Sequence, residues 1–314
     1  MFVKAVLSTF LVCSSQAGNW HHHQAHQAAS RQAAKPAGNL VEELAANGAT
    51  TLIDFAVKAG LADTLTGEGP FTVFAPTNAA FAALPQEIVD AVSADTELLK
   101  SVLLYHVVPG NILSSAASND LTLDTAQGTS LRVNVYSKPH HYGNTITVNG
   151  KSVVKADIKA SNGVIHFIDG VMLIPKGDLV DTLVADDRFS TLVAAVTAAG
   201  LVDTVKNAEA FTIFAPTNDA FAKIPEATLN GLLADKEALT KVLLRHVAPG
   251  AVFAKGVNWG NIATAGGENV CTQVFKTGAV KVSAHSGNSK SSAMVVEADI
   301  TATNGVIHAI DTVI

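Results

Sequence analysis

FTVFAPTNAAFAAL occupies residues 71–84, and FTIFAPTNDAFAKI repeats it at residues 211–224 with ten of fourteen positions identical. Each copy predicts a buried strand, a break and a helix. The strand is short, apolar and rich in aromatic residues. Pro76 ends it, because proline has no amide hydrogen to give to a sheet, and Thr77 or Asn78 can then cap the helix that follows. The sequence therefore predicts a tandem repeat of one structural unit.

The first copy lies within a row of predicted helices that is followed by predicted strands. Apolar residues recur at helical spacing in residues 40–47, 51–60, 86–92 and 96–107. Apolar and polar residues alternate at strand spacing in LTLD, SLRVNVY and TITVNGKSVVK. Asn149-Gly150 is a strong hairpin signal, and Asn162-Gly163 predicts a turn into a last apolar strand. Helices followed by strands, without regular alternation, favour an α+β fold.

The second half of the chain repeats this order. ADITATNGVIHAID at residues 298–311 matches ADIKASNGVIHFID at residues 156–169 in eleven of fourteen positions. The separation between the copies therefore grows from 140 to 142 residues along the chain. We expect the two extra residues among the divergent strands, where HHYGN near residues 140–144 stands against HSGNSKSS at residues 285–292.

These repeats predict two domains, at residues 37–175 and 176–314. The chain has 314 residues and a hydrophobic fraction of 48%, which is sufficient for two cores. Only Lys176-Gly177 separates the two repeats. We therefore expect the domains to abut instead of moving on a long linker.

Residues 1–17 have the features of a secretory signal peptide. They carry one lysine, an apolar run from Ala5 to Val12 and small residues placed for cleavage before Gly18. An ordinary buried helix is the alternative. Residues 18–36 form a polar leader rich in His and Gln, which we expect to be disordered. Two readings of its histidines stay open, a transition-metal site or a solvated spacer: His21, His22, His23 and His26.

The formal net charge is −6, and neither predicted domain has the basic surface that a nucleic-acid backbone requires. Nucleic acid is therefore not an expected partner, and no membrane span is expected beyond the signal peptide. Cleavage of the signal would remove Cys13 and leave Cys271 as the only thiol. An intramolecular disulfide is thereby excluded, which leaves either a buried thiol or a bridge between chains.

Two repeated histidines lie three residues from a carboxylate: His166 with Asp169, and His308 with Asp311. Residues three apart on a strand point to opposite faces, so neither pair can form a catalytic dyad. We expect both histidines in the core, hydrogen-bonded to the backbone. No nucleophile elbow, phosphate-binding loop or zinc-ligand spacing is present. We therefore expect no enzyme and no cofactor, although a hydrolase that pairs His and Asp from different elements stays an alternative.

A third repeated histidine ends the helix predicted at residues 96–107. His106, and its counterpart His246, fall on the apolar side of their helices and are predicted to be structural. Tyr105 is predicted on the more exposed neighbouring face, and Arg245 replaces it in the second copy. Because an aromatic residue and a cation alternate here, we expect the fold to need neither. Such positions would let the copies differ in their partners.

With the FTxFAPTNxAF stretch, the HVxPG helix end and the NGVIHxID strand in this order, residues 37–314 resemble two tandem domains of the fasciclin family. The resemblance implies domains of about 140 residues, each a wedge of β-sheet with helices packed at one side. It also implies a secreted or surface-attached adhesion or matrix protein, since most members are of that kind.

The resemblance further implies candidate partner-binding residues. In animal members, integrin-dependent adhesion is ascribed to a Tyr-His pair among aliphatic residues and to an Asp-Ile pair late in the domain. The positions that match the Tyr-His pair are Tyr105 and His106 in the first domain and His246 in the second. The positions that match the Asp-Ile pair are Asp157 and Ile158, and Asp299 and Ile300. The sequence departs from the animal pattern at Ala156, Ala298, Lys159, Thr301 and Arg245.

We therefore predict a secreted, non-enzymatic adhesion or extracellular-matrix protein. Its expected partners are cell-surface or extracellular proteins, including integrin-like receptors, wall polysaccharide, or other copies of itself. The alternative is a soluble carrier or receptor for a small ligand, held between the helices and the sheet or between the domains.

Overall fold

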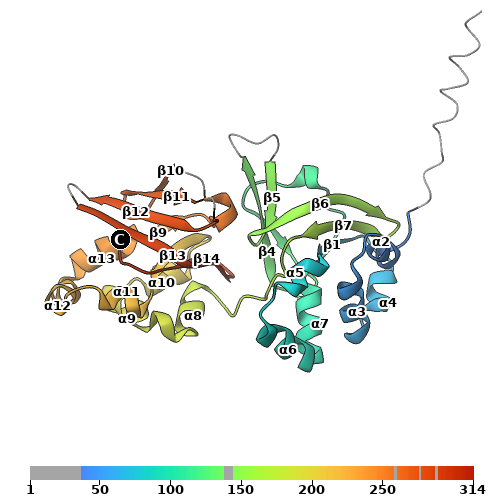
Figure 1. The fold of residues 1–314 in the computed structure, drawn as a ribbon, viewed down its shortest axis with the longest axis horizontal. Helices are drawn as coiled ribbons and strands as arrows, with labels where there is room; N and C mark the ends of the chain where they lie inside the picture. The colour runs from blue at the N-terminus through green and yellow to red at the C-terminus, as the bar shows by residue number, and fades with distance from the viewer. Residues whose placement is uncertain (1–36, 138–143, 258–259, 276, 287–288) are drawn as a thin grey trace, which may run out of the picture. The chain divides into compact units, whose positions relative to one another are not determined.

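A computed structural model describes residues 37–137, 144–257, 260–275, 277–286 and 289–314. The predicted signal peptide and the His-rich leader lie outside these ranges. Residues 38–314 form one compact unit. Two copies of the same α+β arrangement make up this unit (Figure 1).

The first domain begins with helices and ends with strands, as the sequence pattern predicts. Its helices are α2 Leu40–Ala46, α3 Thr50–Lys58, α4 Ala62–Thr66, α5 Asn78–Ala82, α6 Gln86–Ala94 and α7 Thr96–Tyr105, with a short 3-10 turn, η1 Ser114–Ala116. Its strands are β1 Phe71–Pro76, β2 Val107–Pro109, β3 Leu121–Asp124, β4 Ser130–Ser137, β5 Asn144–Val148, β6 Lys151–Ala160 and β7 Gly163–Ile168.

The strands of the first domain form one sheet in the order β2-β1-β7-β6-β5-β4-β3. The pair β1–β7 is parallel, and the other neighbours are antiparallel. The sheet curls until its edges nearly meet. The Ala126 amide after β3 there donates a hydrogen bond to the Val107 carbonyl of β2 at 2.7 Å. Curling leaves two faces to fill, one inside the sheet and one under the helices.

The second domain repeats this topology. Its helices and 3-10 turns are α8 Leu179–Val184, η2 Asp187–Phe189, α9 Ser190–Ala199, α10 Val202–Lys206, α11 Asn218–Ala222, α12 Glu226–Ala234, α13 Lys236–Arg245 and η3 Ala254–Gly256. Its strands are β8 Phe211–Pro216, β9 Val247–Pro249, β10 Gly260–Ala263, β11 Asn269–Val274, β12 Val280–Ser286, β13 Ser289–Ala302 and β14 Gly305–Ile310, in the sheet order β10-β11-β12-β13-β14-β8-β9.

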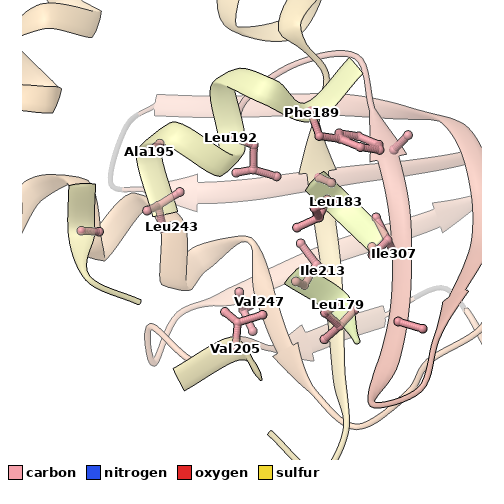
Figure 2. Packing of buried hydrophobic residues seen from close by; sticks show 14 of the residues in the cluster. Leu179, Leu183, Phe189, Leu192, Ala195, Val205, Ile213, Leu243, Val247 and Ile307 are labelled. Atoms are coloured by element: carbon pink, nitrogen blue, oxygen red, sulfur yellow. The ribbon is translucent and has the colours of Figure 1, made fainter. Parts of the chain in front are cut away.

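A large hydrophobic cluster lies on each face of the β1–β7 pair and of the β8–β14 pair. In the second domain, the cluster on the helix side includes Leu183, Phe189, Leu192, Leu243 and Ile307 (Figure 2). The other cluster fills the inside of the curled sheet around Phe214 in the second domain. Burial of these side chains is the main stabilising term for each domain.

The repeated opening stretch folds as predicted. Thr77 caps α5, because its side chain accepts a hydrogen bond from the Ala80 amide at 3.2 Å. Gly163 permits the close parallel pairing of β1 and β7, since a Cβ there would lie 2.0 Å from the Phe71 carbonyl oxygen. The hairpin at Asn149-Gly150 is also confirmed, with φ of 46° and 78° as a tight two-residue turn requires.

Two local predictions are wrong. The helix predicted to end at Val107 ends at Tyr105, because Val107 and Val108 pair with β1 as strand β2. The pairing of HHYGN with HSGNSKSS is also wrong. Val148 pairs with Lys151 across a tight turn, whereas Val282, which holds the same place in β12, pairs with Ala293 across a longer hairpin. Residues 285–286 and 289–292 of HSGNSKSS lie in that longer hairpin, whereas Asn144 of HHYGN begins β5.

Candidate functional site

A histidine and an aspartate brace the same loop in each domain. The His166 ring donates from Nε2 to the Ile112 carbonyl at 2.8 Å and accepts at Nδ1 from the Asp157 amide at 3.2 Å. His308 makes the equivalent contacts with Val252 and Asp299 at 2.8 and 3.3 Å. These bonds require a neutral ring that both donates and accepts. The prediction of core histidines bonded to the backbone is therefore confirmed.

The aspartates complete this bracing. Asp157 and Asp299 lie at a β-bulge with φ of 59° and 62°, which turns their carboxylates toward the loop. Asp157 accepts hydrogen bonds from the Ser114 amide at 2.8 Å and from the Ser114 hydroxyl. Asp299 accepts one from the Ala254 amide at 2.7 Å. We call residues 112–116 and 252–256 the braced loops.

Electrostatics support the charged state of the first of these carboxylates. Partial burial acts to raise the pKa of Asp157, but the hydrogen bonds from Ser114 outweigh burial and hold the pKa below its ordinary value. For His308, burial lowers the pKa, so the ring stays neutral near pH 7. These charge states match the hydrogen bonds that Asp157 and His308 make.

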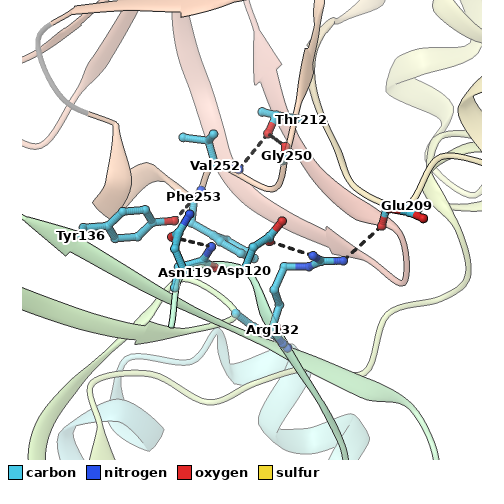
Figure 3. A network of polar contacts seen from close by, with 11 residues as sticks. Asn119, Asp120, Arg132, Tyr136, Glu209, Thr212, Gly250, Val252 and Phe253 are labelled. Carbon is cyan, nitrogen blue, oxygen red and sulfur yellow. Dashed lines mark hydrogen bonds and ion pairs between the residues drawn. The ribbon is translucent and has the colours of Figure 1, made fainter. Parts of the chain in front are cut away.

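The braced loop of the second domain docks on strand β4 of the first (Figure 3). Phe253 at its tip is only 2% exposed, and its amide donates to the Tyr136 hydroxyl at 3.3 Å. A Cβ on Gly256 would lie 2.1 Å from the Tyr136 ring, so only glycine leaves room for this ring. Lys255 forms an ion pair with Asp169 at 2.9 Å. The predicted abutment of the domains thus has a defined contact.

Arg132 extends this contact beside Tyr136 on β4. Its guanidinium pairs with Asp120 at 2.7 Å and donates to the Glu209 carbonyl of the second domain at 3.2 Å (Figure 3). The side chains of Arg132, Asn134 and Tyr136 alternate along β4 with those of Leu131 and Val133, which belong to the inner cluster. We call this set the receiving face of the first domain.

Among the described residues, no such contact is found at the braced loop of the first domain. Leu113, the counterpart of Phe253, is 36% exposed. Ile112 and Ser114 line a small cavity of about 20 Å³ beneath it, against Phe74 and His166. The same loop is thus an internal contact in one domain and an exposed apolar tip in the other.

The Tyr-His pair implied by the resemblance lies inside the first domain. Tyr105 is 0% exposed, and its hydroxyl accepts a hydrogen bond from the Asn149 side chain at 2.7 Å and donates to the Ser130 carbonyl. The expectation that Tyr105 lies on an exposed face, and that the fold does not need it, is wrong. The end of α7 packs on both hydrophobic clusters of the first domain. Strands β4 and β5 therefore cover the Tyr105 side of the helix, which the helical pattern alone predicts to be exposed to solvent.

His106 and His246 are structural, as predicted. His106 donates from Nδ1 to the Val102 carbonyl at 2.7 Å and accepts at Nε2 from the Met172 amide at 3.0 Å. His246 makes the same bonds with Val242 and Ile314. Burial lowers the pKa of each ring to about 4. Neither imidazole reaches the surface.

Among the other predicted binding residues, the two isoleucines pack on the helix-side clusters. Ile158 and Ile300 are half-buried there. Arg245, the counterpart of Tyr105, instead forms an ion pair with Glu268 at 2.6 Å. Of all the predicted site residues, only Asp157 and Asp299 contact a braced loop. Sequence reasoning missed Phe253 and Tyr136, although aromatic residues at a loop tip and a strand end were visible signals.

His166 and Asp169 do not form a dyad, as the strand spacing predicts. Asp169 accepts from the Ser152 amide at 2.7 Å and pairs with Lys255, while His166 bonds to the backbone on the other face. Within the described ranges, no group of three or more His, Cys, Asp or Glu side chains could hold a metal ion. The leader histidines lie outside those ranges. Cys271 is a free, half-buried thiol.

A separate cavity of about 330 Å³ lies in the first domain, between α3, α5, α6 and α7. Its walls are mostly apolar, and Phe55, Phe81 and Ile88 are among them. Helix α6 has no fully buried residue, so it covers the cavity loosely. Of the described residues that line it, none is Asp, Glu, Lys or Arg, and its polar groups are Thr51, Asn78, Gln86, Ser93 and His106.

No helix in the described part of the chain is both long and apolar enough to span a bilayer. A model of the fasciclin domain matches residues 47–175 and again residues 187–314. The chain therefore belongs to the fasciclin-domain family and carries two such domains in tandem.

Longer relatives share this pair of domains. The chain is 36% identical to the transforming growth factor-beta-induced protein ig-h3 of Oryctolagus cuniculus over 282 residues, which is 89% of this chain and 40% of that protein. It is 32% identical to periostin of Homo sapiens over 275 residues, covering 86% of this chain and 30% of periostin. The chain thus spans less than half the length of these relatives.

Among solved structures, the chain is similar to a FAS1 domain pair from the insect cell adhesion molecule fasciclin I. The superposition has a TM-score of 0.40 at 21% identity, and it covers 85% of this chain and 97% of that structure.

Proposed function

We propose that this protein is a secreted, non-enzymatic adhesion or matrix protein that binds through the surfaces of its fasciclin domains. One observation carries the proposal: the polar residues that the domains share are bonded to their own fold. His166 and Asp157 brace a loop, and Asn162 ties α2 to α4 through bonds to the Leu40 amide and the Leu65 carbonyl. Recognition is then left to exposed loops, which differ between the domains.

Extracellular proteins, integrin-like receptors, wall polysaccharide and other copies of the chain are the proposed partners. Asp157 and Ile158, and likewise Asp299 and Ile300, would act in binding by shaping the braced loops. The Asp157 carboxylate already accepts hydrogen bonds from Ser114, so it is not free to bind a receptor cation while the loop is folded. This argues for the loop tip as the contact.

Attachment to coated protein tests the proposal. The mature protein is adsorbed on a surface beside albumin, and binding of cells and of wall polysaccharide is measured. More attachment than to albumin is expected. Equal attachment on both surfaces, with the coated protein shown to be folded, would remove the adhesion function.

A second candidate function, a carrier for a small ligand, is favoured by the cavity in the first domain. At about 330 Å³, it lies in the size range of small-molecule sites. Because the described lining has no charged side chain, the ligand would be neutral and largely apolar, with one polar group near Asn78 or Gln86. An apolar cavity of about 150 Å³ is enough for benzene, so this one could take a molecule about twice that size.

Calorimetric titration with 1-decanol tests this candidate. Binding by the natural chain and its loss in Val92→Trp, which would fill the cavity, would support it. Equal heats from both proteins would exclude a ligand in this cavity.

A further inference from the structure

The docking contact between the domains joins two different surfaces, and each domain carries a copy of both. One surface is the braced loop. The other is the receiving face, whose copy in the second domain is found from strand register. Leu121 pairs with Val133 and Gly260 pairs with Thr272, so Tyr136 and Phe275 hold equivalent places three residues further along.

The second copy of the receiving face consists of Cys271, Gln273 and Phe275. Cys271 and Gln273 alternate with the buried Val270 and Thr272 along β11, and Phe275 directly follows the end of this strand. Phe275 is 44% exposed, although it stands where Tyr136 receives Phe253 in the first domain. An aromatic side chain is therefore present in both faces.

The internal contact uses the loop of the second domain and the face of the first. It leaves the Leu113 loop of the first domain and the Phe275 face of the second without a described partner in the chain. The residue at the loop tip is apolar in both domains. Leu113 is 36% exposed, whereas Phe253 is 2% exposed. A contact between two unlike surfaces can repeat from one molecule to the next, which gives a closed ring or an open row.

We propose that the braced loop of the first domain docks on the receiving face of the second domain in another copy of this chain. Leu113 of one molecule contacts Phe275 of the next, at the place where the Phe253 amide meets the Tyr136 hydroxyl within each molecule. Phe275 has no hydroxyl, so this contact between copies is apolar. The result is a head-to-tail row of molecules. This inference rests on the proposed adhesion function and names the partner and the two surfaces for it.

The contact between copies is weaker than the internal one, for reasons visible in the two loops. Ser115 stands where Lys255 pairs with Asp169, so the ion pair has no counterpart. Ala116 stands where Gly256 makes room for an aromatic ring. No linker holds the two surfaces together either. Association is therefore expected at about 1 µM to about 1 mM, the range of small transient interfaces.

Sedimentation velocity over that concentration range tests the proposal on the full chain. The natural protein is expected to form a concentration-dependent series of oligomers. Leu113→Gln and Phe275→Asp are each expected to weaken association at least tenfold, since each removes one surface. Val57→Asp, at another exposed apolar site (62% exposed), is the control and should associate like the natural protein.

Mixing the two variants gives the sharper result. Leu113→Gln keeps an intact receiving face, and Phe275→Asp keeps an intact loop. The mixture is therefore expected to form heterodimers and no larger oligomers. Ser115→Lys restores the cation that Lys255 supplies and is expected to tighten association with the Asp311 side of the next molecule. Unfolding curves establish that each variant is folded.

The proposal is overturned if both variants associate like the natural protein, or if folded variants fail to recover a dimer on mixing. Surface attachment is measured in parallel. Attachment above albumin with no self-association would overturn this inference alone. Attachment no greater than to albumin, together with no self-association, would overturn the adhesion function as well.

Discussion

The hydroxyl of Tyr136 in the first domain accepts a hydrogen bond from the amide of Phe253 in the second, at 3.3 Å. Burial raises the pKa of Tyr136 to about 12, so the hydroxyl stays protonated and keeps a proton to donate. This bond joins a strand of one fasciclin domain to the braced loop of the next. The loop, and not the shared histidines, is thus the element through which the second domain contacts the first at this point.

Gly256→Val is expected to uncouple the two domains. A Cβ at this position would lie 2.1 Å from the Tyr136 ring, so the loop must withdraw from β4. Calorimetry should then show two unfolding transitions, whereas a single transition is expected for the natural chain. Ala116→Val changes the equivalent, exposed position of the free loop and should leave a single transition. Two transitions in both variants would attribute the effect to valine in the 3-10 turn and not to docking.

Asp157→Ala is expected to loosen the braced loop of the first domain. It leaves the Ser114 amide without its carboxylate and places alanine at a φ of 59°, so we expect a loss of about 2–3 kcal/mol in the free energy of unfolding. Asp157→Gly keeps the backbone relaxed and should lose less. Hydrogen exchange of residues 112–116 should accelerate in both variants. Unchanged exchange there would show that the aspartate does not hold the loop.

Tyr105→Phe separates a structural role from a binding role. The change removes the hydroxyl that Asn149 and Ser130 share, so stability should fall by about 1–2 kcal/mol. Attachment of cells to the coated protein should not change, because Tyr105 is fully buried. Lost attachment with unchanged stability would return Tyr105 to the set of partner-binding residues.

Stability should fall as the pH drops from about 6.5 toward 4. Burial lowers the pKa of His106 and His246 from 6.5 to about 4 in the folded protein, so the unfolded chain binds more protons in this window. The full contribution is present above pH 6.5, and each histidine loses on the order of 3 kcal/mol by pH 4. Urea unfolding at several pH values measures this slope. His106→Gln should reduce the slope by about one proton, and an unchanged slope would contradict the assignment.

Local patterns predicted most of this fold. Apolar spacing located the main helices and strands, Asn149-Gly150 located the hairpin, and the strand argument separated His166 from Asp169. These features depend on residues close together in the sequence. The short helices α4 and α10 were not predicted, because five residues give too few periods for a pattern.

The errors arose where distant segments meet. Tyr105 was predicted on an exposed face because a helix pattern shows only one core, whereas the curled sheet supplies a second. The prediction of Val107 as helical failed because β1 offers it a strand partner. The docking of Phe253 on Tyr136 depends on a turn, a bulge and a linker together. Only the repeated aromatic at Tyr136 and Phe275 hinted at it.

The contact between Tyr136 and the braced loop of the second domain is tested most directly by a double-mutant cycle. The free energy of unfolding is measured for the natural chain, Tyr136→Ala, Gly256→Ala and the double variant, because a Cβ on Gly256 would lie 2.1 Å from the Tyr136 ring. If the loop docks as described, the two changes share one contact, and their effects should differ from additivity by about 1 kcal/mol or more. Effects that add within about 0.3 kcal/mol would show that the two residues do not interact, and the account of the braced loop as a docking element would fail.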